Sequence, residues 1–146
     1  MTIEALLREG RIRVFQASEE EIQRSLELAQ RDLALALELA GQHLDWSFSI
    51  AYNAVLQCCR AYLFRQGYRP TTEGGHVVVF EFLSAQEDPD LREAASYFDR
   101  ARKKRHRTIY DEVGLVTGKQ LDEFLRRTQI LMGQLIERIH QQPFTP

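Results

Sequence analysis

A basic segment in the last third of the chain holds the residue types best suited to chemistry on a phosphate group. Residues 100–111 read RARKKRHRTIYD. Arginine binds phosphate oxygens through two parallel hydrogen bonds, and histidine can take up or release a proton near pH 7. We take four residues as candidate catalytic groups: Arg102, Arg105, His106 and Tyr110. Four more are candidate substrate-binding groups: Arg100, Lys103, Arg107 and Asp111.

The spacing of apolar residues predicts which of these side chains face inward. On a helix over residues 91–111, one apolar stripe is formed by Leu91, Ala94, Ala95, Phe98 and Ala101. Continued along the helix, this stripe reaches Arg102, Arg105 and Ile109. His106 lies on the flank of the stripe. The outward or sideways positions are those of Arg100, Lys103, Lys104 and Arg107.

A core-facing arginine is costly unless it is paired or hydrated. This end of the helix should therefore face a cleft, a partner subunit or acidic side chains, for which the candidates are Glu73, Asp111 and Glu112. A simpler interpretation stays open. Basic residues in the last turns of a helix complement its dipole, so the segment can also be a solvated face of a purely structural dimer.

Helix start and stop signals indicate which elements position this segment. Two capping boxes, Ser18–Glu21 and Thr117–Gln120, open long amphipathic helices. The stretch 76–83 has strand propensity at its start, but a lone strand has nothing to pair with, so we expect a short helix there. The predicted helices span 3–8, 18–41, 45–66, 76–83, 91–111 and 117–140.

These helices predict an all-α fold, an up-and-down bundle of four to five helices. We expect one domain over residues 1–146, with 1–16 as an N-terminal appendage and 141–146 as a frayed tail. The helix over 44–66 has a broad apolar face and few charges, which predicts an innermost position. That face also suggests a surface for forming a homodimer.

Composition narrows the classes of function. The net charge of −2 does not suggest a general nucleic-acid binder, so contact with RNA would be local. The two cysteines, Cys58 and Cys59, are adjacent and allow neither a disulfide framework nor a CxxC metal motif. The four histidines are scattered; His76 could join the site, but we expect it to have a capping or surface role. We expect a cytoplasmic protein with no membrane segment, no metal and no cofactor.

The chain resembles the HEPN family of small helical domains, from about Ser18 to Ile139. Three segments carry the resemblance: SFSIAYNAV with AYL after it, GYRP with GH after it, and YFDRARKKRHRTIYD. The resemblance implies a homodimer whose site forms where two subunits meet. It also implies two kinds of function. Many members are metal-independent ribonucleases and toxins paired with a nucleotidyltransferase-type antitoxin, whereas others are accessory domains in defence systems.

The family signature is an arginine, a polar residue and a histidine, and two registers fit it here. One register pairs Arg100 with His106. The other begins at Arg105, places His106 at the polar position and puts Tyr110 where the histidine is expected; it keeps Arg105 on the inward stripe, and we favour it.

The resemblance thus leaves two interpretations. In the first, the chain is a metal-independent endoribonuclease that can serve as the toxin of a toxin–antitoxin or defence system, with His106 transferring protons and Arg102 and Arg105 stabilising the phosphorane. In the second, it is a non-catalytic HEPN module that binds RNA or a nucleotide, or docks a nucleotidyltransferase-like partner. Tyr110 can donate a hydrogen bond but is a poor base.

Overall fold

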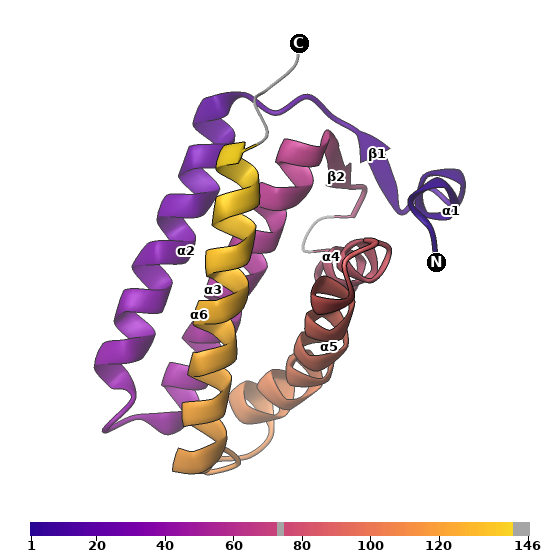
Figure 1. Ribbon diagram of the computed structural model, residues 1–146. Helices are drawn as coiled ribbons and strands as arrows, with labels where there is room; N and C mark the ends of the chain where they lie inside the picture. Colours follow the sequence, from indigo (N-terminus) through magenta and orange to yellow (C-terminus); the bar gives the residue numbers. More distant parts are fainter. Residues whose placement is uncertain (73–74, 142–146) are drawn as a thin grey trace.

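The computed structural model describes residues 1–72 and 75–141, so the candidate acid Glu73 and residues 142–146 of the expected 141–146 tail lie outside the described part. Three long helices run side by side: α2 (Glu19–Leu39), α3 (Leu44–Gln66) and α6 (Gly118–Gln141) (Figure 1). Helices α4 (His76–Ser84) and α5 (Pro89–Tyr110) pack against α3 and against each other. The all-α helical bundle predicted from the sequence is confirmed.

Local signals fix three helix ends where the sequence predicted them. The Ser18 hydroxyl accepts from the Glu21 amide at 3.1 Å, and the Glu21 carboxylate accepts from the Ser18 amide, which completes a capping box before α2. Thr117 and Gln120 make the same reciprocal pair at the start of α6. Gly67 ends α3 with a φ of 94°, a left-handed conformation that favours glycine.

The central helix α3 is covered by the rest of the chain. It packs against α2, α4, α5 and α6, and thirteen of its residues are buried, including Tyr52, Cys58 and Cys59. Its innermost position was predicted correctly. The inference that its broad face is spare surface for a dimer was wrong, because the other four helices already occupy that face. Among its large apolar side chains, Trp46 remains well exposed, at 61%.

The N-terminal segment is not a loose appendage. After α1 (Ile3–Arg8), strand β1 (Ile12–Val14) pairs antiparallel with β2 (Tyr68–Pro70) (Figure 1). Leu6 and Ile12 are buried in the main core. This two-stranded sheet was not predicted, because three-residue strands carry too little alternation to stand out from loops.

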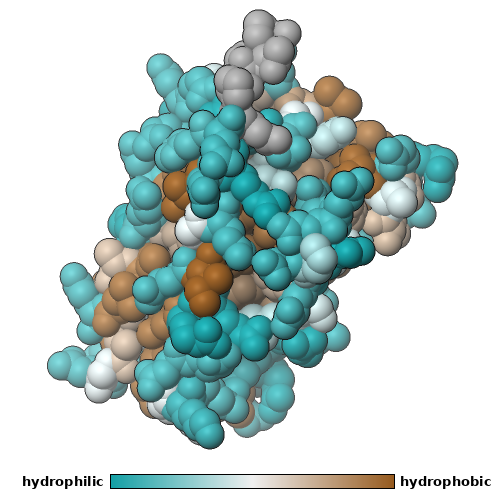
Figure 2. All heavy atoms as spheres, viewed as in Figure 1, coloured by the Kyte–Doolittle hydropathy of each residue, from teal (hydrophilic) through white to brown (hydrophobic). Residues whose placement is uncertain are grey.

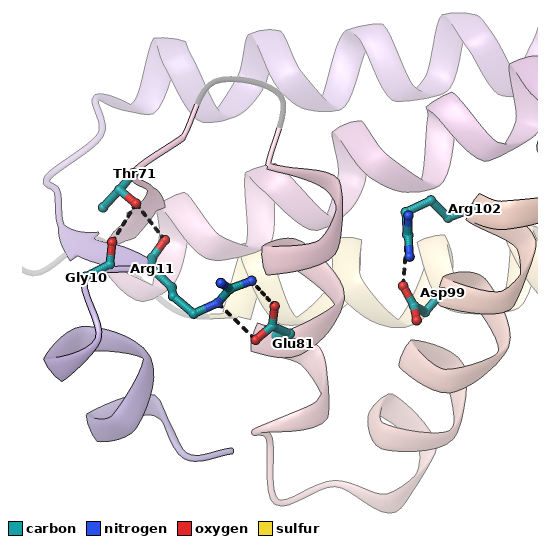
Figure 3. A network of polar contacts seen from close by, with 6 residues as sticks. All are labelled: Gly10, Arg11, Thr71, Glu81, Asp99 and Arg102. Carbon is teal, nitrogen blue, oxygen red and sulfur yellow. Dashed lines mark hydrogen bonds and ion pairs between the residues drawn. The ribbon is translucent and has the colours of Figure 1, made fainter. Parts of the chain in front are cut away.

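Side chains tie this sheet to the helices. The Thr71 hydroxyl donates to the carbonyl oxygen of Gly10 at 2.6 Å, and the Arg11 guanidinium forms an ion pair with Glu81 on α4 (Figure 3). The first residues of the chain therefore brace β2 and α4. Helix α4 begins at His76, which belongs to the site described below.

Candidate functional site

Helix α5 positions most of the candidate residues. Asp88 caps its first turn by accepting from the Asp90 amide at 2.8 Å, and Pro89 supplies a preset first helical residue. Its first three turns bury the apolar stripe: Leu91, Ala95, Phe98 and Ala101. The stripe is packed against α3 and α4, so the rotation of the following basic turns is fixed by the core.

Arg102 is half-buried, as its place on the stripe predicted. Its Nε donates to the Asp99 carboxylate at 3.0 Å, one turn earlier on α5 (Figure 3). The sequence analysis had suggested three other acids as partners for the inward arginines. Asp111 is exposed at the end of α5, Glu112 pairs with Arg107 at 3.4 Å, and Glu73 lies outside the described residues. Asp99 was missed although its three-residue spacing from Arg102 is a standard helical pair.

Arg105 is also half-buried, and its guanidinium lies over the ring of Tyr52, 5.2 Å from the centroid. Its Nε is buried with no hydrogen-bond partner in the part of the chain that the structure describes. Within those residues Arg105 has no ion pair. A cation held on an aromatic face and partly desolvated keeps its charge available, and it attracts an anion more strongly than a hydrated surface arginine.

His76 joins this cluster from α4. The Tyr52 hydroxyl and His76 Nδ1 share a hydrogen bond of 3.1 Å. Burial, together with the positive charges of Arg105, Arg60 and Arg102, lowers the pKa of His76 below its ordinary value. The expected capping or surface role for His76 was wrong: the helix cap of α4 is Gly75, and the imidazole points to the core.

His106 and Tyr110 lie apart from this inner cluster. Both are exposed, and their rings contact each other with centroids 4.8 Å apart. The four candidate catalytic residues therefore form two groups. Arg102 and Arg105 face inward, whereas His106 and Tyr110 lie on an exposed side of α5. The sequence analysis placed His106 on the flank of the stripe but grouped all four residues in one site, so this division was not predicted.

The candidate substrate-binding residues are spread around the outside of α5. Lys103 and Arg107 are exposed, and Asp111 is exposed at the C-terminal cap. Arg100 donates to the Ser96 hydroxyl at 2.9 Å and lies on the side of α5 that faces α6. The structure therefore does not bring Arg100 to the face that holds Arg105 and His76.

Other reactive groups lie away from the site. Cys58 and Cys59 are buried in α3 and carry free thiols, and burial raises the pKa of Cys58 to about 12. They act as packing groups, as predicted. Among the described residues, no group of three or more His, Cys, Asp or Glu side chains is placed to hold a metal ion, and no helix is long and apolar enough to cross a membrane.

Comparison with protein families gives a match to the HEPN domain over residues 16–139, which is most of the chain. The chain belongs to the HEPN family. HEPN domains include ribonucleases and nucleotide-binding proteins, and they commonly dimerise. In this HEPN domain the inner cluster is built from α3, α4 and α5, all within the matched region. Comparison with curated proteins and with solved structures gave no match.

Proposed function

We propose that this HEPN domain binds RNA through α5 and cleaves it without a metal ion, acting as a homodimer. The observation that supports this proposal is the state of Arg105, a half-buried cation held against Tyr52 and lacking a carboxylate partner among the described residues. An unneutralised arginine in such a position is suited to a phosphate oxygen.

The proposed chemistry assigns a role to each candidate residue. The 2′-hydroxyl oxygen of a ribose attacks the adjacent phosphorus, a base accepts its proton, and an acid donates a proton to the departing 5′-oxygen. His106 is suited to these transfers near neutral pH, and Arg102 and Arg105 to stabilising the charge that grows on the phosphorane. Tyr110 supplies a hydrogen bond, while Lys103 and Arg107 attract the RNA backbone.

The separation of the inward arginines from the exposed His106 and Tyr110 favours a site that is completed by a second copy of the chain. His106 is exposed and turns away from the Tyr52 face of its own chain. One copy can therefore offer His106 and Tyr110 to RNA that is held by the arginines of the other copy. The exposed apolar residues beside this region, Trp46 and Val113, provide surface for such a contact.

A second function is favoured by a specific observation. In the register that begins at Arg105, Tyr110 occupies the place expected for histidine, and a tyrosine is a poor base near pH 7. The chain is then a non-catalytic HEPN module that binds RNA or a nucleotide, or docks a nucleotidyltransferase-like partner. A toxin–antitoxin or defence setting belongs to both proposals.

A cleavage assay separates the two functions. Wild type, Arg105→Ala/His106→Ala and a matched control, Arg24→Ala/His140→Ala, are incubated with a labelled structured RNA in excess EDTA. Arg24 and His140 are both exposed and lie on other helices. Light scattering gives the oligomeric state of each variant.

Cleavage by the wild type and the control, with loss in the Arg105/His106 variant, supports the ribonuclease. Intact RNA at high protein excess contradicts it. If RNA then still binds to the wild type and the control but not to the site variant, the non-catalytic function is supported.

A further inference from the structure

A groove between α5 and α6 lies on a different face of α5 from Arg105. Helices α5 and α6 touch where Lys104 bonds Gln120 and where Phe98 contacts Phe124, and they diverge from there toward the start of α5 (Figure 1). The space between α5 and α6 contains two pockets, a larger basin of about 440 Å³ and a smaller basin of about 350 Å³. Tyr97 lines both basins, and the Arg127 guanidinium of α6 lies over its ring, 4.4 Å from the centroid, so the two basins adjoin at this contact.

The floor of the groove is apolar and comes from both helices and from α3. In the larger basin it consists of Phe48, Ala101 and Phe124, and in the smaller one of Ala94, Phe98 and Leu131. Ile130 lies on the wall and is 49% exposed. Figure 2 shows an apolar patch near the centre of this view, where α6 runs in Figure 1, surrounded by polar side chains.

One end of the groove carries positive charge that the described residues do not neutralise. Arg100, Lys104 and Lys119 line the larger basin, and none of them pairs with a carboxylate in the described residues. Arg100 donates to Ser96, and Lys104 donates to the Gln120 side chain at 2.7 Å. This end also holds the N-terminus of α6, whose helix dipole adds to the attraction for an anionic group.

The acids of the groove do not cancel this charge. Glu123 lines the larger basin, but its carboxylate accepts hydrogen bonds from Arg126 and Arg127, which lower its pKa. The smaller basin, at the other end of the groove, is lined by two acids, Asp90 and Glu93, and by two arginines, Arg126 and Arg127. The groove is therefore basic at one end and balanced in charge at the other, which fixes the orientation of an occupant.

The length of the groove matches a helix better than a small molecule. Its lining on α6 extends from Lys119 to Gln134, a rise of about 22 Å along a helix. A compact ligand fills one basin, whereas an amphipathic helix of about four turns lays an apolar stripe over both. We propose that the groove binds an amphipathic helix of a partner protein, with Asp or Glu side chains at the end nearest Lys119.

A peptide selection tests this proposal independently of RNA cleavage. The full chain is used to select from a displayed library of random helix-forming peptides of about 16 residues. We expect enriched peptides to carry apolar residues at i, i+3 or i+4 and i+7, with acidic residues clustered at one end. Their affinities are then measured by fluorescence anisotropy against wild type and variants.

Two groove variants and two matched controls locate the binding. Ile130→Glu should weaken the selected peptides by about tenfold or more, because it places a charge on the apolar wall. Arg100→Glu/Lys119→Glu should weaken them by a similar factor, and more so at low salt. Leu37→Glu and Arg24→Glu, exposed positions on α2, should leave the affinity unchanged.

Four results would overturn the proposal. The first is a selection that enriches no peptide, and the second is enrichment of peptides without the acidic end. The third is equal binding by the groove variants and the wild type. Self-association of the wild type that Ile130→Glu abolishes would also overturn it, because the occupant would then be a second copy of this chain.

Discussion

The basic side chains of α5 are held differently on the two faces of the helix. On the face toward α3 and α4, Arg105 is held against Tyr52 and lies near His76, so its charge has a fixed place. On the face toward α6, Arg100 and Lys104 edge an open groove and are held only by neutral hydrogen-bond partners. Packing of the apolar stripe in the core fixes the rotation of α5, and this rotation determines which basic side chains lie on each face.

The strongest way to break this comparison is to remove the packing that both faces share. Phe98 is 1% exposed and contacts the rings of Tyr97 and Phe124, with centroids 5.0 and 5.4 Å away. Phe98→Ala should lower the free energy of unfolding by about 3–5 kcal/mol, through lost burial and the cavity left behind. Urea denaturation measures the change.

Val113→Ala is the control for this experiment. Val113 is 97% exposed, so the substitution should change the free energy of unfolding by less than about 0.5 kcal/mol. A cost below about 1 kcal/mol for Phe98→Ala would contradict the view that this ring anchors α5.

Removing a single buried hydroxyl tests whether the inner face of α5 has a role beyond ordinary core packing. Tyr52→Phe removes the hydroxyl that bonds His76 and keeps the ring beneath Arg105, and it should cost about 1 kcal/mol of stability. Tyr62→Phe is its match, because the Tyr62 hydroxyl donates to the Gln86 side chain at 3.1 Å. Both variants should lose similar stability in urea denaturation.

Only Tyr52→Phe should also weaken RNA binding, since it alone frees the His76 ring beside the arginines. Equal RNA affinities for the two tyrosine variants would argue that the Tyr52–His76 pair has a structural role alone.

The pH dependence of stability tests whether His76 lies close to the arginines of the inner face. Burial and the nearby arginines lower the pKa of His76 in the folded state, so below its ordinary pKa, about 6.5, the unfolded chain binds more protons there. The free energy of unfolding should therefore fall as the pH decreases from 7 toward 5. His76→Gln should flatten this slope, and Arg105→Met should reduce it by removing a repulsive charge. An unchanged slope in both variants would contradict this account.

The smallest expected effect on stability concerns Arg105 itself. Its buried Nε has no partner among the described residues, so Arg105→Met should leave the free energy of unfolding within about 1 kcal/mol of wild type or raise it. Thermal denaturation at pH 7 measures this. A clear loss of stability would mean that Arg105 serves the fold rather than a ligand.

Periodicity and capping signals were enough to predict the helices and the inward arginines. Arg102 and Arg105 were found because a regular helix carries the apolar stripe of its first turns into the next ones. The same reasoning placed Arg100 outward, and it proved to lie beside α6.

The partners of these arginines could not be predicted from spacing along one helix. Tyr52 and His76 come from α3 and α4, and their meeting with Arg105 depends on how three helices pack. The short sheet was missed for a related reason, because β1 and β2 pair across more than fifty residues of intervening chain. The groove depends on the divergence of α5 and α6, which no local pattern encodes.

The most direct test of the account compares the two faces by the same substitution. RNA affinity is measured by filter binding for Arg105→Met and Arg100→Met over a series of salt concentrations. We predict that Arg105→Met weakens binding by about tenfold or more and that Arg100→Met changes it by less than about threefold. Equal losses, or a larger loss for Arg100→Met, would contradict the assignment of the RNA site to the inner face of α5.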